Sequence, residues 1–225
     1  MAQMPAEKIR TVTKSRTRAA KTDQTSRNTT ATRITRTKTI IKITTGTKTM
    51  EALIHSNERL DDLCRKGYRL IQDPKLFCFG IDAVLLSDYA KVKRGEKAVD
   101  LCTGNGVIPI LLEAKNNGEH YSGLELQPQC ADLARRSVKY NHLEDKVTIE
   151  EGDVCKASEI FGRESVEVVT VNPPYMIGQH GIKNADDAMT IARHEVRCTL
   201  DDIVRESAKM LKFNGRFYMV HRPFR

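Results

Sequence analysis

The sequence predicts an α/β fold, with a mostly parallel, twisted sheet and helices on both of its faces. Short apolar runs of five or six residues alternate with longer segments of helical periodicity, which is typical of parallel strands joined by crossover helices. A glycine-rich loop follows the first of these runs. Acidic or amide residues also follow successive runs, at positions where the carboxyl ends of parallel strands bind ligands.

The first unit consists of a strand, a glycine loop and a helix. Residues 97–101 (KAVDL) read as a short buried strand, and residues 107–115 (VIPILLEAK) have the apolar face of a helix. Between them, Gly104 and Gly106 allow a closer approach of ligand to backbone than a Cβ would permit. A strand, glycine loop and helix N-terminus in this order form a nucleotide-binding opening. The spacing is not the dinucleotide G-x-G-x-x-G; the Asp-x-x-x-Gly-x-Gly pattern from Asp100 favours S-adenosylmethionine, with Asp100 directed toward its amino-acid end.

Two further strands are each followed by an acidic residue. Residues 120–125 (HYSGLE) form the second strand, and its last residue, Glu125, can accept hydrogen bonds from both hydroxyls of a ribose. After a helix that begins near Pro128, residues 146–150 form a third strand, and Asp153 is placed to meet the adenine amine of the cofactor. Each acid alone is more often a solvated loop carboxylate. The ordered series of glycine loop and acids is what indicates a nucleotide ligand.

The tetrapeptide Asn172-Pro173-Pro174-Tyr175 follows a fourth apolar run, residues 166–171 (VEVVTV). Asn-Pro and Pro-Pro sequences mark turns in general, because Pro fixes φ and the residue before it avoids the helical region. At the end of a buried strand, the Asn side-chain oxygen and the Pro173 carbonyl can both accept hydrogen bonds from a planar NH2 group. Two fixed acceptors favour a pyramidal nitrogen with a localised lone pair, and Tyr175 can stack on the planar group. The motif therefore indicates methylation of an adenine amine or a carboxamide nitrogen.

The C-terminal part adds one helix and one strand. Residues 199–202 (TLDD) have a capping-box pattern, and a helical face continues from there to Leu211. We expect Asn214-Gly215 to end that helix and residues 216–220 to form a fifth strand. No further strand pattern follows, so we expect this strand to lie at an edge of the sheet.

Charge and composition divide the chain near Met50. Residues 1–50 hold 12 of the 37 Lys and Arg residues and two of the 29 acids, which leaves 25 basic and 27 acidic residues for 51–225. The same segment contains 15 Thr and no aromatic residue, so it has few apolar groups to offset the entropy of ordering. We expect residues 1–49 to be a disordered or non-native tail and residues 50–225 to be the catalytic domain. A basic arm for nucleic acid and a transit peptide are the two other interpretations of the tail.

The remaining composition narrows the class of protein. The six Cys residues show no C-x-x-C spacing and the His residues are dispersed, so no metal site is indicated, and reduced thiols suit the cytoplasm. No apolar run approaches the ~20 residues that a membrane span needs. We expect a cytoplasmic protein without a membrane or metal partner, and a monomer is the favoured state.

From about residue 59 onward, the chain resembles the class I S-adenosylmethionine-dependent methyltransferases, which have a Rossmann-like fold. The glycine loop and the Asn-Pro-Pro-Tyr tetrapeptide carry this resemblance. More narrowly, it is similar to bacterial enzymes that methylate the adenine amine next to the anticodon of valine tRNA. The segments that match are residues 68–72 (YRLIQ), 77–86 (FCFGIDAVLL), 124–127 (LELQ), 192–195 (ARHE) and 220–223 (VHRP). The superfamily's sheet has seven strands, so the resemblance implies that the last two are missing here.

The resemblance also implies roles for individual residues. The target amine would be held by Asn172 and the Pro173 carbonyl, with Tyr175 stacked on the base. The residues around S-adenosylmethionine would be Phe79, Asp82, Asp100, Thr103, Gly104, Gly106, Glu125, Asp153 and Asn172. Phe79 is equally compatible with an ordinary core position.

Three functions remain open from the sequence. The first is methylation of an adenine N6 amine in tRNA, where loops offer unstacked bases to an aromatic side chain. The second is methylation of a glutamine carboxamide in a protein, which needs the same acceptors for the same NH2 group. The third is an inactive module that binds S-adenosylmethionine or RNA. Candidates for contact with tRNA are Lys66, Arg69, Lys183 and Arg222.

Overall fold

The computed structural model describes residues 50–76, 78–173 and 198–221, all of which belong to one compact unit, Met50–Arg225. The strands are β1 (Arg59–Asp62), β2 (Arg69–Gln72), β3 (Lys97–Leu101), β4 (His120–Glu125), β5 (Val147–Glu151), β6 (Val166–Val171) and β7 (Leu211–Met219). The helices are α2 (Ile81–Tyr89), α3 (Val107–Lys115), α4 (Pro128–Tyr140), the 3-10 turn η1 (Val154–Lys156), α5 (Ala157–Phe161) and α7 (Leu200–Met210).

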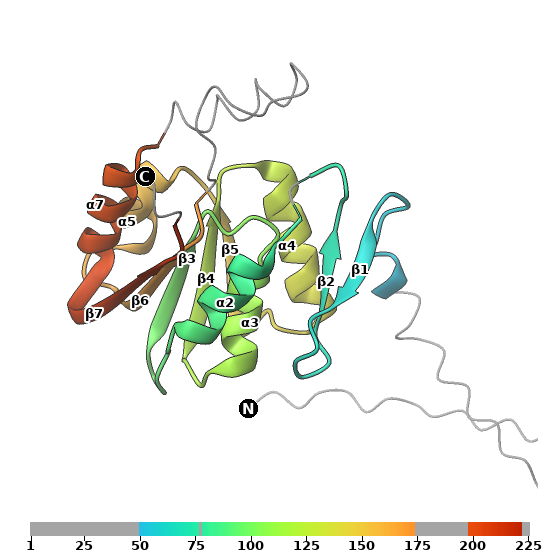
Figure 1. The fold of residues 1–225 in the computed structure, drawn as a ribbon, viewed down its shortest axis with the longest axis horizontal. Helices are drawn as coiled ribbons and strands as arrows, with labels where there is room; N and C mark the ends of the chain where they lie inside the picture. The colour runs from blue at the N-terminus through green and yellow to red at the C-terminus, as the bar shows by residue number, and fades with distance from the viewer. Residues whose placement is uncertain (1–49, 77, 174–197, 222–225) are drawn as a thin grey trace, which may run out of the picture. The chain divides into compact units, whose positions relative to one another are not determined.

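Five strands form one sheet in the order β5-β4-β3-β6-β7, and every neighbouring pair is parallel (Figure 1). A separate antiparallel hairpin, β1-β2, lies outside this sheet. Parallel strands need crossover connections, and helices supply them between β3, β4 and β5. The predicted α/β class is confirmed.

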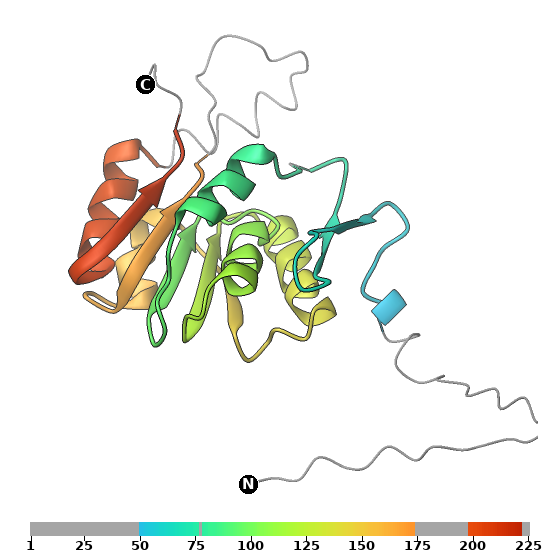
Figure 2. The same ribbon diagram turned by 60° about the horizontal axis from the view of Figure 1, so that its bottom comes forward.

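Helices cover both faces of the sheet, as the alternation of side chains along the strands requires (Figure 2). Ala98 of β3 packs in a core cluster with residues of α2, α3 and α4, whereas its neighbour Val99 packs in a second cluster with residues of α5 and α7. Asp100 therefore points to the α2 and α3 face, like Ala98. Among the described residues, no helix is long and apolar enough to cross a membrane.

Most predicted element boundaries agree with the structure, but the end of α7 was placed wrongly. The predicted capping box is present: the Thr199 side chain accepts from the Asp202 amide, and the Asp202 carboxylate accepts from the Thr199 amide. The helix ends at Met210, and Asn214-Gly215 lies within β7 rather than ending α7. The reason is an irregularity in pairing: Val166 pairs with Leu211, but Val168 pairs with Arg216. The extra β7 residues are accommodated by Asn214, which has a φ of 61°, and by the glycine beside it.

The β1-β2 hairpin is attached to α4 by side-chain hydrogen bonds. The amide of Ile71 donates to Ser137 Oγ at 3.0 Å, and the amide of Arg69 donates to Asn141 Oδ1 at 2.8 Å. Arg136 of the same helix donates from both terminal nitrogens to the Glu58 carboxylate, at 2.6 and 2.7 Å, and also to the Leu53 carbonyl. Glu58 and Arg136 are largely buried, so this ion pair fixes the segment before β1.

We predict that Arg136→Met destabilises the protein by about 3 kcal/mol, because the buried Glu58 carboxylate loses its guanidinium partner and keeps only the amide and ring of His55. Arg135→Met is a matched control on the same helix. Arg135 makes an ion pair with Glu151 that is 3.8 Å long and about half exposed, and it donates one hydrogen bond to the Ile149 carbonyl at 3.0 Å. Loss of both costs about 1 kcal/mol, less than loss of the buried pair. Chemical denaturation measures both; equal losses for the two variants would contradict the role given to the buried pair.

Candidate active site

The register of the three central strands gathers the predicted site residues at one edge. Leu101 at the end of β3 pairs with Leu124 of β4 on one side and with Val171 of β6 on the other. Neighbouring strands lie about 4.8 Å apart. The residues that follow, Glu125 and Asn172, therefore flank the beginning of the glycine loop. For methyl transfer, the glycine loop and the Asn-Pro-Pro-Tyr motif would have to lie side by side, and this register brings their beginnings together.

The two glycines of the loop are required for different reasons. Gly106, the N-cap of α3, has a φ of 79°, and a Cβ there would lie 2.9 Å from the Cβ of Ala134. Gly104 also has a positive φ, 59°, but a Cβ would meet no atom within 4 Å. Gly106 thus allows α3 to pack against α4, whereas Gly104 faces open space at the sheet edge, where a ligand can approach the backbone.

Glu125 is 6% exposed and is held by backbone amides. One of its carboxylate oxygens accepts from the Gly104 amide at 2.8 Å, and the other accepts from the Gln127 amide at 2.9 Å. The Glu125 carbonyl accepts from the Gly152 amide at 2.9 Å. The carboxylate is therefore fixed against the glycine loop. Each carboxylate oxygen has a second lone pair, so the group can also accept hydrogen bonds from hydroxyl groups.

Asp100 is buried at the end of β3 and its carboxyl group is only partly satisfied. Oδ1 accepts from the Thr170 hydroxyl of the neighbouring strand at 2.6 Å. The pKa of Asp100 is raised to about 7, chiefly by burial and to a smaller extent by the charge of Glu125, while the hydroxyls of Thr170 and Thr103 act in the opposite direction. Although the Thr103 hydroxyl is near enough to affect the pKa, both Asp100 Oδ2 and Thr103 Oγ1 are buried without a partner in hydrogen-bond geometry.

Buried polar atoms without partners are rare in folded proteins, and here two of them lie at the beginning of the glycine loop. A ligand with hydrogen-bond donors or a positive charge would satisfy Asp100 Oδ2. The amino-acid end of S-adenosylmethionine carries an ammonium group, so the residues present fit the cofactor that the sequence predicted.

The other predicted cofactor residues lie around this edge. Asp153 follows β5, next to the end of β4, and its Oδ1 accepts from the Cys155 amide at 2.9 Å. Asp82 is in the first turn of α2 and is partly exposed. Phe79 precedes that helix and packs against the core cluster that contains Ala98, so it lies on the same face of the sheet as Asp100. That packing agrees with the core interpretation of Phe79.

Gln72, for which no sequence pattern predicted a role, connects three parts of the site. Gln72 is 1% exposed. Its Oε1 accepts from the Phe79 amide and from the Asn105 side chain, both at 3.2 Å, and its Nε2 donates to Asp61. Gln72 thus joins the hairpin, the segment before α2 and the glycine loop. One feature of the sequence could have indicated this role, namely a glutamine at the end of an otherwise apolar strand (LIQ).

Only half of the Asn-Pro-Pro-Tyr tetrapeptide lies in the described part of the chain. Asn172 is partly buried and Pro173 is buried, directly after β6. Pro174 and Tyr175 lie outside the described residues, as do Lys183, residues 192–195 and Arg222.

The fold also brings together two cysteines that are far apart in sequence. The thiols of Cys155 and Cys198 and the carboxylate of Asp202 lie within 4.8 Å of one another. Asp202 already accepts from Thr199 in the capping box and pairs with Arg205. Two thiols are fewer than the ligands that a structural zinc site needs, so we assign no metal to this group.

Comparison with curated proteins finds similar enzymes in several bacteria. A tRNA1(Val) (adenine(37)-N6)-methyltransferase from Histophilus somni is 26% identical over 159 residues, which cover 69% of this chain and 65% of that protein. An enzyme of the same name from Porphyromonas gingivalis is 25% identical over 147 residues, which cover 63% and 57%. The chain thus spans about three fifths to two thirds of the length of these relatives.

Among solved structures, the chain is similar to a geranyl diphosphate C-methyltransferase from Streptomyces coelicolor bound to S-adenosyl-L-homocysteine. The two are 18% identical, with a TM-score of 0.49 and coverage of 63% of this chain and 45% of that one. The family model described as methyltransferase small domain matches residues 68–225, which is well over half of the chain. The chain therefore belongs to the methyltransferase small domain family.

Proposed function

We propose that this methyltransferase acts on the exocyclic N6 amine of an adenine in tRNA, next to the anticodon of valine tRNA. One observation carries the proposal: the register of β3 with β4 and β6 sets Asn172 and Glu125 on either side of the glycine loop. In this proposal, Asn172 is the acceptor for the target amine and the glycine loop holds the cofactor, so the two groups lie side by side. The nucleotide and the tRNA come from the similarity to enzymes of that name.

S-adenosylmethionine supplies a methyl group that is activated by its sulfonium. In our proposal, Asp100 and Thr103 hold the amino-acid end, because their unpartnered oxygens lie at the start of the loop. Gly104 leaves space for the ligand, and Glu125 accepts from the ribose hydroxyls. Asp153, after the next strand, meets the adenine of the cofactor, with Phe79 and Asp82 on the α2 side.

The side chain of Asn172 and the carbonyl of Pro173 hold the target NH2 group through two hydrogen bonds. These acceptors favour a lone pair that points at the methyl group, and Tyr175 stacks on the base. An amine held in this way would take the methyl group in line as the S–CH3 bond breaks, which would leave S-adenosylhomocysteine, and it would lose its proton to water after the C–N bond has formed. No strongly basic side chain is needed, so orientation and fixed electrostatics account for the catalysis.

The class of substrate is tested by incubation of the chain with labelled S-adenosylmethionine, total RNA and total protein. RNase-sensitive label supports the proposal, and its mapping to N6 of adenine in valine tRNA supports the nucleotide. Protease-sensitive label on glutamine would instead favour the carboxamide substrate. Absence of label from both pools would contradict an active enzyme.

We predict that Asn172→Ala lowers the rate of methyl transfer by about 100-fold or more, because one of the two amine acceptors is removed. The Kd for S-adenosylmethionine, measured by calorimetry, should change less than threefold. Asn57→Ala, at an exposed position before β1, is the control and should keep full activity. A parallel fall in activity and cofactor affinity would contradict the role of Asn172 in holding the amine.

We predict that the affinity for S-adenosylmethionine rises with pH through about 7, because the ammonium group binds the ionised form of Asp100. At pH 6 about one tenth of this carboxyl group is ionised, against about half at pH 7, where the α-amino group of the ligand is still mostly charged, so binding should be roughly fivefold weaker at pH 6 than at pH 7. Asp100→Asn should bind weakly at every pH, whereas Asp145→Asn, an exposed control, should keep the wild-type profile.

The same carboxyl group should affect stability without cofactor. Its pKa is raised in the folded state, so the stabilising contribution is present below the unfolded pKa of about 4 and is lost as pH rises through 7. The wild type should lose up to about 4 kcal/mol over that window relative to Asp100→Asn. Denaturation curves at pH 5 and pH 8 should show about 2.5 kcal/mol of this loss, because the rest falls below pH 5. Parallel curves for the two proteins would rule it out.

A further inference from the structure

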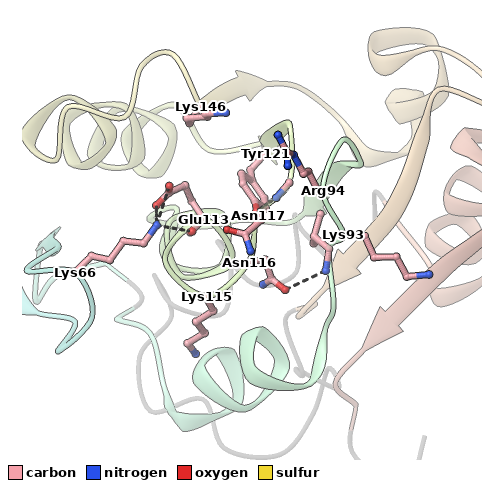
Figure 3. Close-up of a pocket in the computed structure, with 11 residues that line it drawn as sticks. Lys66, Lys93, Arg94, Glu113, Lys115, Asn116, Asn117, Tyr121 and Lys146 are labelled. Carbon is pink, nitrogen blue, oxygen red and sulfur yellow. Dashed lines mark hydrogen bonds and ion pairs between the residues drawn. The ribbon is translucent and has the colours of Figure 1, made fainter.

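A hollow of about 540 Å3 lies at the amino edge of the sheet, opposite the candidate active site. It is formed by the segments that precede β3, β4 and β5, together with the turn of the β1-β2 hairpin. Its charged lining consists of Lys66, Lys93, Arg94, Lys115, Lys146 and a single acid, Glu113 (Figure 3).

This concentration of positive charge is unusual for this unit. Residues 51–225 contain 25 basic and 27 acidic residues, so the unit as a whole has a slight excess of acid. Five cations to one acid in a single hollow therefore depart from the average composition. A concave surface lined by one sign of charge focuses its field and attracts ions of the opposite sign.

Two of the five cations are neutralised by nearby carboxylates. Lys66 pairs with Glu113 at 3.1 Å and also donates to the Glu113 carbonyl. Lys115 pairs with Asp88 of α2 at 2.7 Å. Both lie near the C-terminus of α3, where exposed carbonyls favour cations, so helix capping explains them.

The other three cations have no such explanation. Three cations, Lys93, Arg94 and Lys146, are exposed, and no carboxylate among the described residues lies within 4 Å of their charged groups. The Lys146 ammonium donates to the Glu119 carbonyl at 3.3 Å, a neutral acceptor that leaves its charge uncompensated. The nearby acids are used elsewhere: Glu96 pairs with Arg216, and Glu119 pairs with Lys97. The hollow thus keeps three uncompensated positive charges.

The backbone that carries these cations is fixed. Tyr121 is 1% exposed at the floor, and its hydroxyl accepts from the Gly118 amide at 2.8 Å. Asn116 Oδ1 accepts from the Val92 amide at 3.1 Å, which joins the loop before β4 to the turn before β3. A Cβ at Gly118 would lie 2.8 Å from both Tyr121 and Val92, so the loop packs closely. A site that is already ordered loses less entropy when it binds a ligand.

We propose that this hollow binds phosphate groups of the RNA substrate and anchors the RNA at a distance from the methylated base. Uncompensated Lys and Arg side chains on an ordered backbone are suited to phosphodiesters. The strands between the two edges contain five or six residues, a span of about 20 Å, which a folded RNA readily bridges. The inference rests on the proposed function, because only an RNA substrate provides a phosphate backbone at both edges.

The test is the affinity of the full chain for an unmodified valine tRNA transcript, measured by fluorescence anisotropy at several salt concentrations. The double variant Arg94→Gln/Lys146→Gln should bind about tenfold more weakly at moderate salt, with a salt slope reduced by up to about two. Its rate at saturating RNA, its Kd for S-adenosylmethionine and its melting temperature should be unchanged. The matched control Lys139→Gln/Arg163→Gln removes two exposed charges elsewhere and should bind RNA like the wild type.

Residues 1–49 are present in every variant, so their contribution cancels in the ratio of affinities. Equal RNA affinity for the double variant and the wild type would overturn the inference. Loss of affinity for inorganic tripolyphosphate without loss for RNA would also overturn it, since the hollow would then serve a small polyanion. The proposed function is judged separately, by whether the wild type transfers methyl groups to RNA.

Discussion

The candidate site depends on the parallel pairing of β3 between β4 and β6. Hydrogen bonds along these strands fix where each one ends, so the pairing of Leu101 with Leu124 and Val171 sets the positions of Glu125 and Asn172. A shift of one residue would turn every side chain of a strand to the opposite face. The apolar side chains of β3 prevent such a shift, because Ala98 and Val99 belong to cores on opposite faces of the sheet. The hydrophobic core thus determines the geometry of the polar edge.

The same pairing places Asp100 beside Thr170 inside the sheet, where a charged carboxylate is poorly solvated. The sheet provides one hydroxyl donor but leaves Oδ2 without a partner. The unpartnered Asp100 Oδ2 therefore lowers the stability of the folded protein, and in the proposed function a hydrogen bond from the cofactor ammonium would compensate for this loss. Glu125 differs, because backbone amides hold both of its oxygens before any ligand arrives.

The strands of the main sheet and the helices α3, α4 and α7 were largely readable from sequence, because apolar runs and the glycine loop are local signals. The β1-β2 hairpin, α2 and α5 were not predicted as elements. The end of α7 was not predicted either, since Asn214-Gly215 is a usual helix terminator and its place in β7 depends on pairing with β6. The residues Asp100, Glu125 and Asp153 were predicted as cofactor residues from their positions at or after the ends of strands. Their partners were not: the contact of Gln72 with Asn105 joins residues 33 positions apart, and that of Thr170 with Asp100 joins residues 70 apart. Such contacts arise only when the chain is folded.

The charges of the two sheet edges are complementary to different parts of the proposed reaction. The carboxyl edge gathers the acids Asp100, Glu125 and Asp153, which suit a cationic, hydroxyl-rich cofactor but repel the phosphates of RNA. A site of this kind gains little affinity for RNA from its own field, and it needs attraction from another surface of the protein. The uncompensated cations at the amino edge provide a field of the required sign without placing phosphates near the acids. In the proposed function, separation of the two charge types on opposite ends of the same strands would let one small domain bind a cationic cofactor and a polyanionic substrate together.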